Sequence, residues 1–141
     1  RKHRMDRQEL VDETKKSEGD PHMKQQRREK GIDIALNKML ADVPGADVVV
    51  VNPTHYAVAL SWKRDQGEVP VCVAKGIDHA AARIREVASE AGVPIYSDPP
   101  TARALHATIE VGQGIAPDHY RAVAAAIRFA DRMRRIARAL T

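Results

Sequence analysis

The chain has 141 residues, of which 43% are hydrophobic, 30% are charged and only 4% are aromatic. This length suits one domain with an appendage, and the scarcity of aromatic residues predicts a small core of Ala, Val, Ile and Leu. A net charge of +4 is too small to indicate a nucleic-acid-binding protein, the single Cys72 excludes an internal disulfide, and no apolar run reaches the roughly 18 residues of a membrane-spanning helix.

Residues 1–42 form a highly charged first segment, with eleven Lys or Arg and nine Asp or Glu. Gly19-Asp20-Pro21 interrupts it, so we expect a linker-like helix over 1–20 and an amphipathic helix over 22–42 that docks by its C-terminal half. The opening RKHRMDRQEL is basic and lacks an initiator Met, which is typical of a segment just inside the cytoplasmic end of a membrane helix. We therefore expect this chain to be a piece of a longer protein.

Strands and helices alternate after this segment. The sequence predicts strands over 46–51, 55–62, 69–76 and 93–98, and helices over 77–92, 99–114 and 116–140. The run ADVVVV is continuously β-branched at its end, as in a strand that is buried on both faces. The alternation predicts an α/β fold, in which a central mixed sheet of about four strands is flanked by helices and preceded by the long charged helix or linker.

The helix predicted over 116–140 is both amphipathic and basic. Between residues 128 and 138 there are five Arg and one Asp. Such a helix could meet an acidic partner, a membrane surface or nucleic acid, but a solvated helix face explains the same pattern and is favoured. Its buried stripe is predicted to contain Tyr120, Val123, Ile127, Ala130 and Met133.

Cysteine and histidine give little indication of other chemistry. Cys72 alternates with valines on an apolar strand, which favours a buried structural thiol over a nucleophile. His79 and His119 lie near helix starts beside Asp78 and Asp118, but no set of residues has the spacing of metal ligands. We therefore expect neither a metal nor a cofactor.

The segment VVVVNPTHYAVAL places Asn-Pro-Thr-His between two strands, where a tight turn would more often use Asn-Gly or Asp-Gly. Because Pro53 has no N–H, its nitrogen cannot attack the Asn52 side chain as it would in deamidation. The reverse attack stays open, in which the Asn52 carboxamide nitrogen attacks the carbonyl carbon of the same residue. A succinimide then forms, the Pro53 nitrogen leaves, and the chain is cut between the two residues.

Neighbouring residues can assist this reaction. Rigid strands on either side would hold the attack geometry, and well-oriented intramolecular reactions gain effective molarities on the order of 10⁵ M. His55 would either accept a proton from the carboxamide or orient it, while the N–H of Thr54 would face the developing oxyanion. A plain structural turn is the alternative, because Asn-Pro is a common way to begin a turn.

The segment NPTHYAVAL resembles the cleavage motif of the FlhB/YscU family, the self-cleaving switch proteins of type III secretion. MDRQELVDETKKSEGDPHMKQQRRE is similar to the linker of that family, and VAKGIDHAAARIREVASEAGVPI and PDHYRAVAAAI are similar to later segments. The resemblance runs from about residue 5 to residue 130, and YAVAL places it nearer the flagellar branch. The family commonly has PPLARAL where this chain has PPTARAL, so packing or a partner contact is expected to differ at Thr101.

The resemblance implies that Asn52, Pro53, Thr54 and His55 are the catalytic residues of a single-turnover self-cleavage, not of a turnover enzyme. It also implies a domain organisation, with 1–42 as a charged helical linker from an absent membrane part and 43–141 as the self-cleaving domain. The whole protein would be anchored in the bacterial inner membrane, with this chain on its cytoplasmic side.

The implied function is in bacterial flagellum biogenesis and protein transport, where cleavage takes part in switching export from rod and hook subunits to filament subunits. The implied partners are other export-gate components, a hook-length control protein, and export substrates with their chaperones. Neither nucleic acid nor a small-molecule substrate is expected. The alternative is an uncleaved α/β interaction module whose Arg-rich C-terminal helix binds an acidic partner or nucleic acid.

Overall fold

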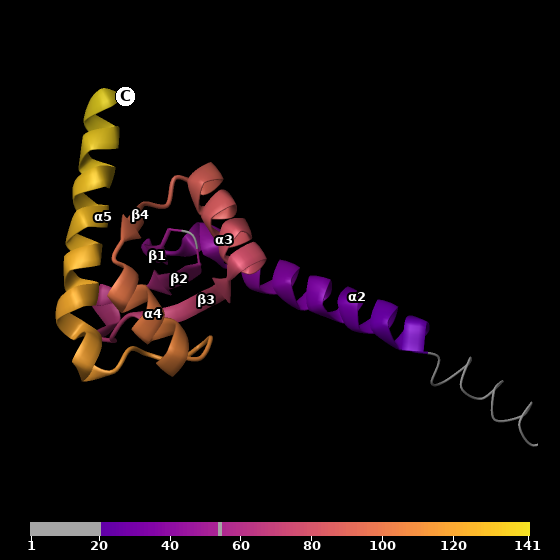
Figure 1. Ribbon diagram of the computed structural model, residues 1–141. Helices are drawn as coiled ribbons and strands as arrows, with labels where there is room; N and C mark the ends of the chain where they lie inside the picture. Colours follow the sequence, from indigo (N-terminus) through magenta and orange to yellow (C-terminus); the bar gives the residue numbers. More distant parts are fainter. Residues whose placement is uncertain (1–20, 54) are drawn as a thin grey trace, which may run out of the picture. The chain divides into compact units, whose positions relative to one another are not determined.

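The computed structural model describes residues 21–53 and 55–141 (Figure 1). The linker-like helix expected over 1–20 and the expected role of Thr54 lie outside these residues. The chain divides into two compact units, the first of which ends at Asn37 while the second spans Lys38–Thr141. The predicted domain organisation, 1–42 and 43–141, stays a prediction.

Helix α2 spans Pro21–Leu40 and closely matches the helix predicted over 22–42. Ile32 and Ile34 are 59% and 63% exposed, whereas Leu40 is buried. Burial of apolar residues therefore begins only near the end of this helix. Within the described part of the chain, no helix is both long and apolar enough to cross a membrane.

The second unit is built on a four-stranded mixed sheet, as the sequence predicts. The strands are β1 (Val48–Asn52), β2 (Tyr56–Ser61), β3 (Val71–Ile77) and β4 (Ile95–Ser97), in the spatial order β3-β2-β1-β4. The pairs β1–β2 and β2–β3 are antiparallel, and β1–β4 is parallel. Since β1 lies between two neighbours, its β-branched residues 48–51 are all buried, which confirms the interpretation of this run.

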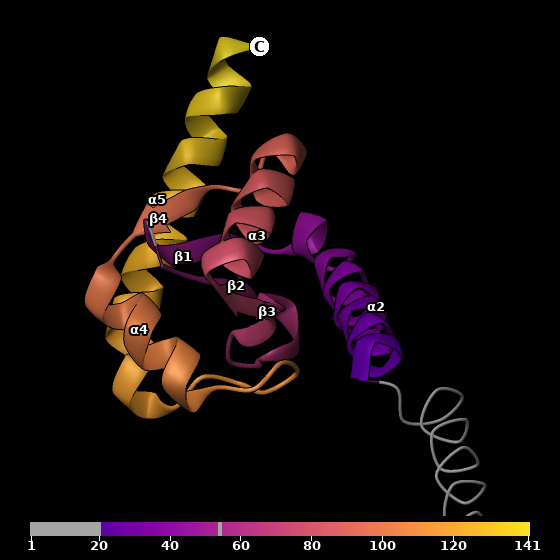
Figure 2. The ribbon, with the colours of Figure 1, turned by 45° about the vertical axis from the view of Figure 1, so that its right-hand side comes forward.

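Three helices cover the two faces of the sheet (Figures 1 and 2). Helix α3 (Asp78–Ala91) packs on one face, and α4 (Pro99–Thr108) and α5 (Tyr120–Leu140) pack on the other. Short 3-10 helices occur at Val43–Gly45, Arg64–Gln66 and Pro117–His119. Gly92 ends α3 in the left-handed region, with φ of 76°, so the predicted C-cap is confirmed.

The main core lies between the sheet and the helices α4 and α5. Its strand residues include Val50, Val58 and Leu60, all of which are fully buried. From α5 it takes Val123, Ala126, Ile127 and Ala130. The predicted stripe on α5 is wrong at its first position, because Tyr120 at the N-terminal end of the helix is 45% exposed.

The helix predicted over 99–114 is too long, because α4 ends at Thr108. The chain after it turns back to the sheet, where Gly114 forms a bridge with Val71 and the Gly112 N–H donates to the Cys72 carbonyl. Gly112 has φ of 91°, a conformation that a helix cannot contain and that glycine adopts without strain. The two glycines thus convert the predicted last turns into a strand-like return.

The strand directions distinguish two ends of the sheet. Because β1, β3 and β4 run in the same direction, their carboxyl ends gather at one end, where α3 and α4 begin. The segment that joins β1 to β2 lies at this end. Strand β2 leads from there to Ser61 and Trp62 at the opposite end of the sheet.

Candidate functional site

Asn52, Pro53 and His55 belong to the turn that joins β1 to β2, called here the Asn52 turn. Asn52 is the last residue of β1 and pairs with Tyr56, the first residue of β2. The His55 N–H donates to the Asn52 carbonyl oxygen across 2.9 Å, which is the bond that closes a four-residue β-turn. Pro53 occupies the second position, where its fixed φ suits such a turn. Asn52 is half-buried, while Pro53 and His55 are exposed.

The bond from His55 bears directly on the chemistry of the Asn52 carbonyl. Attack on this carbonyl carbon moves negative charge onto the oxygen, which already has an N–H donor at 2.9 Å. Preorganised donors of this kind stabilise an oxyanion most effectively. The sequence interpretation gave this role to the N–H of Thr54, which lies outside the described residues. Proline at the second position of a four-residue turn is the signal that could have identified the N–H of the fourth residue, His55, as the donor.

The main chain on the β1 side of the turn is held from both neighbouring strands. Val51 is buried and pairs with Ala57 on β2, and its carbonyl accepts from the Asp98 N–H at 3.0 Å. Of the described residues, none hydrogen-bonds to the Asn52 carboxamide. The backbone of Asn52 is thus held rigidly, whereas no hydrogen bond from the described residues keeps its side chain away from its own carbonyl.

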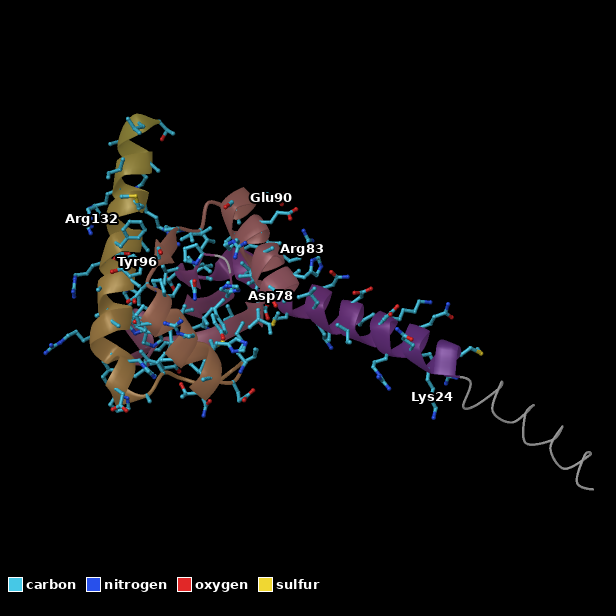
Figure 3. All side chains as sticks on the ribbon, viewed as in Figure 1. Lys24, Asp78, Arg83, Glu90, Tyr96 and Arg132 are labelled. Atoms are coloured by element: carbon cyan, nitrogen blue, oxygen red, sulfur yellow. The ribbon has the colours of Figure 1, made fainter. Side chains whose placement is uncertain are left out.

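His55 is held by a residue that sequence reasoning did not assign to the site. The Asp78 N–H donates to the His55 carbonyl at 2.9 Å, and Asp78 Oδ1 lies 3.5 Å from His55 Nδ1. Figure 3 labels Asp78 at the N-terminal end of α3. Tyr56 pairs with Ile77, so the next step of the β2–β3 ladder brings His55 to Asp78. The register between β2 and β3, which the sequence does not reveal, creates this contact.

Comparison with known proteins decides the family. The family model described as "FlhB HrpN YscU SpaS Family" matches residues 1–130. The chain belongs to this family. It is 46% identical over 135 residues to the flagellar biosynthetic protein FlhB of Escherichia coli, a match that covers 96% of this chain and 35% of that protein. The chain thus spans about a third of the length of that relative.

Solved structures of FlhB-family domains share the fold. The cytoplasmic domain of FlhB from Shewanella putrefaciens is 39% identical, with a TM-score of 0.69 over 74% of this chain and 80% of that one. An asparagine-to-alanine variant of the EscU C-terminal domain is 33% identical, with a TM-score of 0.63 over 65% of this chain and 92% of that one. These matches confirm the predicted α/β fold and the predicted resemblance.

Thr101, where the sequence analysis expected a departure from the family pattern, contributes to a helix cap. Asp98 is the N-cap of α4, and its Oδ1 accepts from the Thr101 N–H at 3.3 Å. The Thr101 hydroxyl donates to the other carboxylate oxygen, Asp98 Oδ2, at 2.7 Å. An apolar residue at 101 would keep the backbone bond and lose the hydroxyl bond. The hydroxyl of Thr101 thus strengthens the start of α4 beside the Asn52 turn.

A groove of about 460 Å³ lies at the opposite end of the sheet, called here the Trp62 groove. Its apolar walls include Trp62, Val69, Pro70, Ile115, Tyr120 and Ile127. On its rim, Arg64 lies 4.9 Å from the centre of the Trp62 ring and 2.8 Å from Asp131. The hydrogen bond between them raises the pKa of Arg64 and lowers the pKa of Asp131. The groove therefore combines an apolar floor with fixed charges of both signs.

Cys72 lies in the core, away from the exposed surface at both ends of the sheet. It is fully buried, and its Sγ lies 3.4 Å from the Ala74 carbonyl oxygen. Burial raises the pKa of this thiol to about 11, so it stays protonated and unreactive at neutral pH. The expectation of a buried structural thiol is confirmed.

Proposed function

We propose that this chain is the cytoplasmic part of a flagellar type III export component that cuts itself between Asn52 and Pro53. Three features support the proposal: membership of the FlhB/YscU family, the Asn-Pro sequence at the turn, and the donor on the Asn52 carbonyl. The last of these carries most weight, because it is a property of this chain's own geometry. It aims an N–H at the oxygen where the reaction would develop charge.

The reaction needs only groups of the turn and one water molecule. The carboxamide nitrogen of Asn52 loses a proton and bonds to the carbonyl carbon, whose oxygen becomes an oxyanion held by the His55 N–H. The oxyanion collapses, the bond to the Pro53 nitrogen breaks, and that nitrogen takes up a proton. The products are a C-terminal succinimide, which water opens to a carboxylate, and a chain that begins with a prolyl ammonium. The His55 ring either takes the first proton or orients the carboxamide, and Thr54 completes the proposed set.

The two products are expected to stay together after the cut. Strands β1 and β2 pair over five residues each, and residues 48–51 and 57–60 are all buried. Full burial of one Val or Leu side chain is worth about 1.5–3 kcal/mol. Cutting an exposed turn removes none of this burial. Cleavage would therefore change the turn and keep the core intact.

Export switching requires that other proteins contact this domain. The expected partners are export-gate components, a hook-length control protein, and export substrates with their chaperones. We place substrate docking at the Trp62 groove, with a short apolar segment of an exported protein as its occupant. The groove's apolar walls fit such side chains, and the Arg64–Asp131 pair offers polar contacts at the rim. Because Trp62 is the only tryptophan of the chain, its fluorescence reports binding of such a peptide.

Mass spectrometry of freshly refolded and then denatured protein tests the cleavage. The wild-type chain is expected to yield fragments 1–52 and 53–141, and Asn52→Ala, which lacks the nucleophile, is expected to stay whole. Pro53→Ala and His55→Ala are expected to be cut more slowly. A single intact species in the wild type, or fragments from Asn52→Ala, would contradict the proposal and leave the uncut interaction module.

A further inference from the structure

Asp78 has a backbone conformation unlike that of any other non-glycine residue in the described ranges. Its φ is +47°, in the left-handed region that side chains with a Cβ seldom adopt. After glycine, Asp and Asn are the residues that tolerate this region best. Such outliers persist where the surrounding structure fixes them, and they cluster at functional sites.

The conformation of Asp78 directs two of its groups at a single residue of the Asn52 turn. Its N–H holds the His55 carbonyl at 2.9 Å, and its carboxylate lies 3.5 Å from the Nδ1 atom of the same residue. The other side of His55 is also fixed, because its own N–H is bonded to the Asn52 carbonyl. His55 is therefore clamped between Asp78 and the carbonyl of the scissile bond.

Both side chains are largely exposed, at 63% for His55 and 74% for Asp78. Exposed ion pairs contribute little to folding stability because water screens them. The pair is therefore better suited to orienting the ring than to stabilising the domain. A carboxylate on Nδ1 fixes the ring orientation and leaves Nε2 as the nitrogen that can face the carboxamide.

We propose that Asp78 is a positioning residue for the self-cleavage, and that its carboxylate holds the His55 ring over the Asn52 turn. The inference rests on the proposed self-cleavage. Asp78 does not touch the scissile bond, so it acts only through His55. The expected signature is a loss of cleavage rate without a loss of stability, which vanishes when the His55 ring is absent.

Two substitutions separate the carboxylate from the backbone. Glycine and asparagine both tolerate φ of +47°, so neither strains the start of α3. Asp78→Asn keeps an oxygen that can accept from Nδ1, whereas Asp78→Gly removes it and leaves the backbone N–H in place. We expect Asp78→Gly to be cut about tenfold more slowly, and Asp78→Asn to be cut within about threefold of the wild type.

The experiment follows fragments 1–52 and 53–141 by mass spectrometry after refolding from denaturant. Thermal unfolding is measured in parallel in the Asn52→Ala background, so that every variant is compared as a whole chain. The melting temperature of the Asp78→Gly variant is expected to be no lower than that of the chain with Asp78, because glycine suits the left-handed conformation. The control is His79→Ala, which changes the exposed neighbour on the first turn of α3 and should be cut at the wild-type rate.

A double variant makes the test specific to the ring. In a His55→Ala background, Asp78→Gly is expected to cause no further slowing, because the group it positions is gone. Three outcomes would each overturn the inference while self-cleavage stands. In the first, Asp78→Gly is cut at the wild-type rate; in the second, Asp78→Asn is slowed as much as Asp78→Gly. In the third, Asp78→Gly slows cleavage in the His55→Ala background as much as it does in the wild type. An uncut wild-type chain would overturn both.

If Asp78→Gly fails to fold, NMR of the Asn52→Ala chain gives a second measurement. There, Asp78→Asn and Asp78→Ser, which has a shorter side chain, are compared by the rotamer couplings of the His55 ring. Asp78→Asn should retain one ring orientation and Asp78→Ser should show averaging. One retained orientation in both variants would overturn the inference.

Discussion

The Asn52 turn and the Trp62 groove lie at opposite ends of β2 and are built in different ways. The turn is largely exposed and depends on backbone hydrogen bonds, among them the bond from the His55 N–H to the Asn52 carbonyl. The groove depends on packed apolar side chains of the sheet and α5. The six residues of β2 separate them by roughly 20 Å at about 3.3 Å per residue. The proposed cleavage and the proposed docking would thus occur at separate ends of the sheet, where one end can change without disrupting the other.

The largest expected effect comes from the core that both regions share. Leu60 is fully buried near the groove end of β2. Leu60→Ala should lower the free energy of unfolding by about 2–5 kcal/mol, through lost burial and the cavity left behind. Urea unfolding of the Asn52→Ala chain measures this loss. The backbone hydrogen bonds of the turn stay intact, so the folded variant should still cut itself. Loss of cleavage in a variant that remains folded would show that the two ends of the sheet are not independent.

Two glycines allow each end to be disturbed alone. A Cβ at Gly76, near the turn, would lie 2.6 Å from the Ala80 Cβ and 3.1 Å from its main-chain carbon. Gly76→Ala should therefore cost about 1–3 kcal/mol and slow cleavage, since it displaces the start of α3. A Cβ at Gly114 would instead meet Val69 Cγ2 at 2.7 Å, in the groove wall.

Gly114→Ala should change Trp62 fluorescence and spare cleavage, because Val69 is a side chain of the groove that can shift. Gly45→Ala is the matched control, since nothing lies within 4 Å of its added Cβ. Cleavage rate, Trp62 emission and urea unfolding are measured for all three variants. Equal effects of Gly76→Ala and Gly114→Ala on both readouts would contradict the separation.

The sequence predicted the strands well and pointed to the proposed cleavage residues, and it missed contacts that depend on strand register and on helix packing. The β-branched run of β1 and the Asn-Pro pair are local signals, so both could be found without a structure. Asp78 could not be connected to His55, because the connection depends on the Tyr56–Ile77 register between strands. The groove was missed for a similar reason, since Trp62 and Tyr120 are brought together only by the packing of α5 on the sheet.

A smaller effect is expected at the helix that starts beside the turn. Thr101→Val keeps the shape of the side chain and the backbone bond to Asp98 but loses the hydroxyl bond of 2.7 Å. The loss should be about 0.5–1.5 kcal/mol, the usual net value of one hydrogen bond. Urea unfolding of the Asn52→Ala chain checks it. In an Asp98→Ala background the same change should cost much less, and equal costs would argue against the shared cap.

The smallest effect on stability is expected at the groove rim, and its size depends on pH. The Arg64 hydrogen bond lowers the pKa of Asp131 in the folded chain, so their pairing stabilises the fold above the unfolded pKa of Asp, roughly 3.9. This contribution should fade as the pH falls through the lower folded pKa. Arg64 is 47% exposed and Asp131 30%, so solvent screening limits the pair to about 0.2–1 kcal/mol.

A double-mutant cycle with Arg64→Gln and Asp131→Asn isolates the pair from the stacking of Arg64 on Trp62. Its coupling energy should be present at pH 7, shrink towards pH 3 and weaken in high salt. A coupling that grows in acid would show that something other than the ionised Asp131 holds Arg64. Cleavage at the Asn52 turn should not follow this cycle at all, because the rim carboxylate lies at the other end of β2 and shares no hydrogen bond with the turn among the described residues.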